Sequence, residues 1–118
     1  MFEIARCFSG AGEIAQKSGN TNLAKILYRE GRILDPSFSD NYMRAVELYF
    51  NEQNYNTAIA LCKEALKDCP EAYWCSIYDM NAYYVYKILG LSYYLINNKE
   101  LAICYLTIAN QKNFENEI

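Results

Sequence analysis

The stretch NLAKILYREGRILDP at residues 22–36 aligns with NTAIALCKEALKDCP at residues 56–70 when the chain is shifted by 34 residues. The shift places alanine on alanine, leucine on leucine and proline on proline, in the pairs Ala24 and Ala58, Leu27 and Leu61, and Pro36 and Pro70. Small residues at fixed places and a closing proline, at this period, are typical of a solenoid of helix–turn–helix units. One such unit cannot bury its apolar face alone, so the pattern predicts an all-α stack of units.

The composition is that of one packed domain. Of the 118 residues, 53% are hydrophobic, which is enough for a modest core. The net charge of −3 argues against a partner held through nucleic-acid phosphates. No apolar run reaches the roughly 18–20 residues that span a bilayer, and residues 1–6 do not resemble the start of a signal peptide. We therefore expect a single domain over residues 1–118 that is soluble and cytoplasmic, with neither a nucleic acid nor a membrane as partner.

The cysteines predict reduced thiols rather than a metal site or a disulfide framework. They number five and form no CxxC pair: Cys7, Cys62, Cys69, Cys75 and Cys104. Cys62 and Cys104 lie in apolar helical patterns, where a thiol behaves as a small hydrophobic group, so we expect both to be buried. The chain has no histidine, and an all-cysteine zinc site would need ligands from distant elements. We expect no metal and no cofactor.

Apolar periodicity and turn residues predict six helices in three pairs. The expected helices run over residues 2–18, from a Thr21 cap to Asp35-Pro36, from a Ser39 or Asp40 cap to 51, over 56–67, from a Ser76 or Asp79 cap to 96, and over 99–110. They group into units at about 5–38, 39–72 and 80–114. The third unit matches the second at a shift of 44, so an aromatic-rich insertion at about 71–81 separates the two.

Taken together, the units resemble tetratricopeptide repeats (TPRs). The residues that carry the resemblance are Phe8, Gly12, Ala15, Ala24, Tyr28, Gly31 and Pro36 in the first unit, Tyr42, Ala45, Tyr49, Ala58, Cys62, Ala65 and Pro70 in the second, and Tyr86, Leu89, Gly90, Tyr93, Ala102, Leu106 and Ala109 in the third. Phe114 stands where a proline is usual. The resemblance implies a right-handed α-solenoid of three antiparallel helix pairs. It also implies a non-catalytic protein–protein interaction module, an adaptor or chaperone-like domain that binds a peptide segment in its concave groove.

A second resemblance concerns the aromatic insertion. The stretch from Leu48 through Tyr73-Trp74 to Tyr94 is similar to TPR segments appended to bacterial family-2 glycosyltransferases, in which such an insertion separates one repeat from the next. This likeness implies that the chain is the helical appendage or fragment of a larger protein. The sequence itself lacks the strand–helix alternation and the acidic metal-binding motif of a sugar-nucleotide domain.

The TPR resemblance also implies which side chains line the groove, because the first helices of the pairs face it. The transferred positions are Glu13, Met43, Glu47, Phe50, Tyr84, Lys87, Leu91 and Tyr94, beside Arg6, Ser9 and Gln16. The family's basic-and-amide clamp for a peptide carboxylate is not expected, since only Lys87 fits it. We expect a groove that is acidic in the middle and aromatic toward its C-terminal half, suited to a peptide with Lys or Arg and an apolar anchor. The alternative is that the carboxylates are solvated and the tyrosines pack the fold.

The last predicted helix is unusual for the end of a stack. Residues 101–109, LAICYLTIA, are apolar nearly all round, whereas a terminal helix is usually polar outside. We expect this helix to meet a partner or a second copy of the chain through Ile103 and Leu106. Trp74, in the insertion, either joins a recognition patch or fills space beneath a long connection.

The sequence offers no catalytic constellation. Histidine, the commonest general base, is absent, and there is no Gly-rich phosphate loop or nucleophile elbow. The recurring carboxylates Glu30 and Glu64 hold equivalent positions in the two repeats, which is typical of a solvated helix face. We expect no enzyme. The remaining hypotheses are a peptide-binding adaptor, an appendage of a larger protein, and a self-associating structural module.

Overall fold

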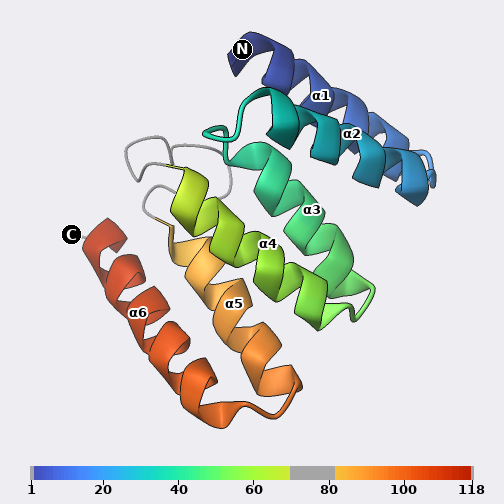
Figure 1. Cartoon of the computed structure of the whole chain (residues 1–118). Coiled ribbons are helices and arrows are strands. Elements are labelled where there is room, and N and C mark those ends of the chain that lie inside the picture. Colours follow the sequence, from blue (N-terminus) through green and yellow to red (C-terminus); the bar gives the residue numbers. More distant parts are fainter. Residues whose placement is uncertain (1, 70–81, 118) are drawn as a thin grey trace.

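The computed structural model describes the backbone of residues 2–69 and 82–117, and every regular element in these ranges is an α-helix (Figure 1). The helices are α1 (Phe2–Lys17), α2 (Thr21–Leu34), α3 (Asp40–Asn51), α4 (Tyr55–Asp68), α5 (Tyr83–Leu95) and α6 (Lys99–Glu117). The predicted all-α fold of three helix pairs is confirmed.

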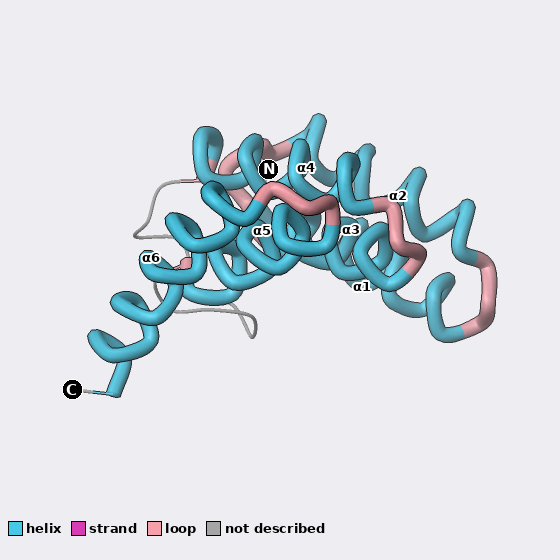
Figure 2. Tube along the Cα trace, turned by 90° about the horizontal axis from the view of Figure 1, so that it is seen from below, coloured by secondary structure: helices cyan, strands magenta, loops and turns pink. Residues whose placement is uncertain are grey.

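The helices stack in chain order. α1 packs on α2, α3 on α4 and α5 on α6, while α2 meets α3 and α4 meets α5 between the pairs. As a result α1 and α2 lie at one end of the stack and α6 lies at the other, as two perpendicular views show (Figures 1 and 2). The two ends of the stack therefore belong to the first and the last helix pair.

The same turn connects the two helices of each pair. A residue with positive φ precedes an asparagine whose side-chain oxygen accepts the backbone N–H three residues on. The positive-φ residues are Gly19, Gln53 and Asn97, and the capping asparagines are Asn20, Asn54 and Asn98. Such a cap satisfies one of the free N–H groups at a helix start. The prediction of Thr21 as the cap of α2 was wrong, because Asn20 accepts from the N–H of Leu23 at 3.2 Å.

Within a pair, one small residue lets the two helices approach. A Cβ on Gly12 of α1 would overlap the buried ring of Tyr28 in α2, and a Cβ on Gly90 of α5 would lie 2.7 Å from Cγ of Leu106 in α6. The equivalent positions in the middle pair hold Val46 and Cys62, both fully buried. The larger side chain thus comes from the second helix in the outer pairs and from the first helix in the middle pair, which keeps the shared space filled.

Other predictions at the C-terminal side need correction. Helix α6 continues to Glu117 instead of ending near Asn110. Cys104 is exposed, because it lies on the side of α6 away from α5, whereas Cys62 is buried as expected. The proposed caps Ser76 and Asp79, like the insertion at about 71–81, lie outside the described residues.

Two glycines of α1 provide a matched test of the close approach. Gly10 has open space where a Cβ would be added, whereas Gly12 faces the Tyr28 ring. We expect Gly10→Ala to raise the free energy of unfolding by up to about 1 kcal/mol through helix propensity. Gly12→Ala should lower it by about 1–3 kcal/mol, because the added methyl overpacks the pair. Urea unfolding followed by circular dichroism measures both, and equal stabilisation by the two substitutions would contradict the packing described.

Candidate functional site

The helices α1, α3 and α5 form the inner layer of the stack. The Cα atoms of α1 and α3, and of α3 and α5, approach within 8 Å, whereas among the described residues those of α2, α4 and α6 do not approach one another. A stack whose first helices lie closer together than its second helices curves toward the first. The surface shared by α1, α3 and α5 is therefore the candidate site, and we call it the inner face.

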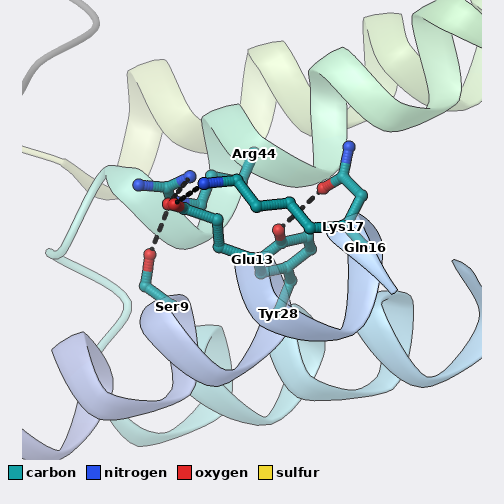
Figure 3. Close-up of polar contacts among 6 residues, drawn as sticks. All are labelled: Ser9, Glu13, Gln16, Lys17, Tyr28 and Arg44. Atoms are coloured by element: carbon teal, nitrogen blue, oxygen red, sulfur yellow. Dashed lines mark hydrogen bonds and ion pairs between the residues drawn. The ribbon is translucent and has the colours of Figure 1, made fainter. Parts of the chain in front are cut away.

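A charged cluster joins α1 to α3 on this face (Figure 3). The Glu13 carboxylate pairs with Lys17 Nζ at 2.9 Å through one oxygen and with Arg44 Nη1 at 2.5 Å through the other. Arg44 also donates from Nε to the hydroxyl of Ser9 at 2.9 Å. Two residues of α1, the buried Ser9 and Glu13, thus hold the guanidinium of Arg44 from α3.

These partners change the charge that Glu13 offers. The hydrogen bond from Lys17 and the positive charge of Arg44 hold the pKa of Glu13 below its ordinary value of 4.5. The carboxylate is ionised near neutral pH, but two cations already surround it. The expectation of an acidic inner face therefore does not hold at Glu13.

A second polar contact ties Gln16, one of the transferred groove positions, to the packing of the first pair (Figure 3). The Tyr28 hydroxyl donates to Gln16 Oε1 at 2.8 Å. Burial raises the pKa of Tyr28, so the phenol stays protonated and keeps this bond. Gln16 thus satisfies a buried hydroxyl of α2, which leaves it less free to contact a ligand.

Glu47 differs from Glu13, although the two are equivalent at the 34-residue shift. Its half-buried carboxylate accepts from the Tyr84 hydroxyl of α5 at 3.4 Å, and no cation pairs with it among the described residues. Burial and the charge of Glu47 raise the pKa of Tyr84 to about 12, so the phenol remains a donor near neutral pH. Of these two equivalent carboxylates, Glu47 is therefore the one without a paired cation among the described residues.

The other predicted groove residues have different surroundings. Met43 is fully buried in the core and exposes no surface, so it does not line a groove in this structure. Phe50 is half-buried and packs edge-on against Tyr55 of α4, with ring centroids 5.4 Å apart. Met43 is therefore a core residue, whereas Phe50 keeps part of its surface exposed beside Tyr55.

The α5 residues remain on the surface. Leu91 is half-buried and Tyr94 is exposed. The Lys87 ammonium lies 6.0 Å from the centroid of the Tyr83 ring, one turn earlier on the same helix. Together with Tyr84, which contacts Glu47, they form an aromatic surface on α5.

Arg44 is the functional side chain that the sequence analysis missed. At the 34-residue shift, the equivalent of Arg44 in α1 is Gly10, which has no side chain to compare. One signal was present, since Arg44 is the only basic residue between Asp40 and Asn51. On the neighbouring helix α1, Glu13 supplies the carboxylate that pairs with Arg44, and the buried Ser9 accepts a hydrogen bond from it.

The two predicted interface residues of α6, Ile103 and Leu106, do not form one exposed surface. Ile103 is exposed, whereas Leu106 is half-buried with its Cγ against Gly90. Leu106 therefore packs within the last pair instead of projecting outward. Trp74 lies outside the described residues.

In the part of the chain that the structure describes, no group of three or more histidine, cysteine or acidic residues is placed to hold a metal ion. None of its helices combines the length and the apolar character needed to cross a bilayer.

The fold of this chain is similar to that of a solved domain. The chain is similar to the N-terminal domain of stress-induced protein-1 (STI-1) from C. elegans, with a TM-score of 0.78 and 17% sequence identity. The likeness covers 94% of this chain and 85% of that one. No protein-family model matches the sequence, and no curated protein matches it. The six helices and this likeness show a TPR-type fold of three helix pairs.

Two double-mutant cycles test the charged cluster. Glu13→Gln combined with Arg44→Met should show a coupling of about 1 kcal/mol in the free energy of unfolding, because Arg44 is largely buried. Glu13→Gln combined with Lys17→Met should give only about 0.3–0.5 kcal/mol, since the Lys17 side chain is 75% exposed.

The pH dependence of the first cycle follows from the lowered pKa. The coupling should be fully present above pH 4.5, the ordinary carboxyl value, and disappear as the pH falls through the lowered pKa of Glu13. Urea unfolding at several pH values measures it. Equal couplings in the two cycles, or a first coupling that survives in strong acid, would contradict the role given to Arg44.

Proposed function

We propose that this chain is a protein-interaction module that binds a peptide segment across α3 and α5 of its inner face. The segment carries a lysine or arginine and an apolar side chain. The observation that carries this proposal is the contrast between two equivalent carboxylates. Glu13 is surrounded by Lys17 and Arg44, whereas Glu47 has a tyrosine hydroxyl and no cation among the described residues.

The surroundings of Glu47 suit a cationic side chain. A half-buried carboxylate attracts a cation more strongly than a fully solvated one, because water screens the pair less. The Tyr84 hydroxyl donates to one carboxylate oxygen and leaves the other available. A lysine or arginine of a bound segment would therefore complete at Glu47 the pairing that Arg44 already supplies at Glu13.

The α5 surface supplies the apolar part of the contact. Tyr94 is exposed and Leu91 half-buried, each at a position equivalent to a predicted groove residue of the middle pair. Tyrosine gives a large contact area at a low cost in side-chain entropy, which is why it recurs in binding surfaces. The bound segment is accordingly placed along α5, with its cation toward α3.

The other functional hypotheses have less support from the described residues. A cytoplasmic location and the absence of catalysis accompany the proposed module as predictions. The alternative of an appendage to a family-2 glycosyltransferase rests on the aromatic insertion, which lies outside the described residues. No curated protein matches the chain, so no observation favours that alternative over the interaction module.

The proposal is tested by selection from a random peptide library displayed on phage. We expect the selected peptides to share a basic residue beside an aliphatic or aromatic one. Titration of one such synthetic peptide into the isotopically labelled protein should shift backbone amide signals of α3 and α5 much more than those of α2 and α4. Selected peptides that are acidic, or shifts confined to the second helices, would refute the proposed site.

Charge substitutions separate specific binding from general attraction. Glu47→Gln should weaken the peptide about tenfold, since a partly desolvated ion pair is lost. Glu64→Gln is the matched control, because Glu64 is an exposed carboxylate on α4 of the same pair and should change the affinity less than twofold. Isothermal titration calorimetry measures both, and equal losses would show that only net charge matters.

A further inference from the structure

The exposed large apolar side chains of the described residues are confined to the two ends of the stack. On the first pair they are Ile4, Ile14, Leu23, Ile26 and Ile33, and at the last pair Tyr94, Leu95, Ile96, Leu101 and Ile103. The middle pair, α3 with α4, has none among its described residues. Single exposed apolar residues are ordinary. Several of them on each end pair are unusual, because end repeats usually carry polar outer faces.

The apolar surface of α1 corresponds to the surface that α3 and α5 bury between pairs. Ile14 is 68% exposed, whereas its equivalent Leu48, 34 residues on, is 4% exposed. The same holds for two more positions of α1, which are exposed there and buried in both later units. These positions are Cys7, with Asn41 and Val85 as equivalents, and Ala11, with Ala45 and Leu89. Helix α1 thus presents an inter-pair contact surface that no described residue covers.

The last pair presents the opposite half of such a contact. Ile59 of α4 is 8% exposed and belongs to the core cluster that includes Val85 and Leu89 of α5. Its equivalent in α6, 44 residues on, is Ile103, which is 66% exposed. Ile103 therefore has the position of a side chain that packs on the first helix of a following pair.

We propose that the chain associates head to tail with a second copy of itself, with the Ile103 surface of α6 seated on the Cys7, Ala11 and Ile14 surface of α1 in the next copy. The two ends hold the positions that meet between α4 and α5, where Ile59 shares a cluster with Val85 and Leu89, so this pairing repeats the contact of the second junction. None of these four positions holds a charged residue, so the side chains at the centre of the contact bury no charge.

The alternative of a symmetric dimer fits the positions less well. Pairing two α1 surfaces would bring together the same half of the internal contact and leave Ile103 exposed. Head-to-tail contacts are heterologous, and such contacts extend into open chains of copies unless the rotation closes a ring. The assembly therefore grows with protein concentration and does not stop at a dimer.

Sedimentation velocity over a series of protein concentrations tests this arrangement. The wild-type chain should show average masses that rise beyond a dimer as concentration increases. Ile14→Asp blocks only the α1 surface and Ile103→Asp only the α6 surface, so each variant alone should stay monomeric at the concentrations at which the wild type associates. An equimolar mixture of the two should form dimers and nothing larger, because one intact surface remains on each variant.

The two aspartate substitutions should block association without unfolding the protein. Both substituted side chains are exposed, so the thermal unfolding of each variant should remain close to that of the wild type. Ala60→Asp, at an exposed position of α4 in the middle pair, should leave assembly unchanged. The proposal is overturned if the wild type stays monomeric at every concentration, if Ile103→Asp still dimerises, or if the mixture of variants remains monomeric.

Discussion

The structure depends on the close approach of the two helices within each pair, where one small residue faces one larger side chain. Gly12 receives the ring of Tyr28, Gly90 receives Leu106, and the middle pair reverses the sizes with Val46 and Cys62. Close packing penalises both a void and an extra methyl group, so each pair has a fixed separation. Because the pairs are rigid in this way, the stack can repeat one geometry and bring α1, α3 and α5 into a common layer.

The contacts between pairs are chemically different at the two junctions. One apolar cluster runs through both junctions, and between the first and second pairs two ion pairs are added to it, Lys25 with Glu52 at 2.8 Å and Arg44 with Glu13. Between the second and third pairs the contacts are mainly apolar, with Ile59, Val85 and Leu89 in one cluster. The first junction pairs Glu13 with cations, whereas Glu47 has a tyrosine hydroxyl and no paired cation among the described residues. The head-to-tail association that we propose would form a contact of the second type at Ile14 and Ile103, which are exposed at the ends of the stack.

The sequence predicted the fold well because the repeat period reports directly which residues share a helix face. The three pairs, the glycines at the close approaches and the buried Cys62 all follow from that period. The side chains of the site were harder to predict. Position transfer treats Met43 as a groove residue, although its unbranched chain turns into the core. It also passes over Arg44, whose equivalent is a glycine, and over Asn20, whose capping role depends on the positive φ of Gly19. The repeat period identifies which residues share a helix face, whereas helix caps and ion pairs depend on local geometry.

A size exchange within the first pair tests the packing rule most directly. Gly12→Val with Tyr28→Cys gives α1 and α2 the residues that the middle pair uses. Tyr28→Cys alone should cost about 2–4 kcal/mol of unfolding free energy through the cavity it leaves, and Gly12→Val alone about 1–3 kcal/mol through overlap. The account predicts that the double variant is more stable than the sum of the two losses allows, by about 1–3 kcal/mol. Additive losses in urea unfolding would contradict it.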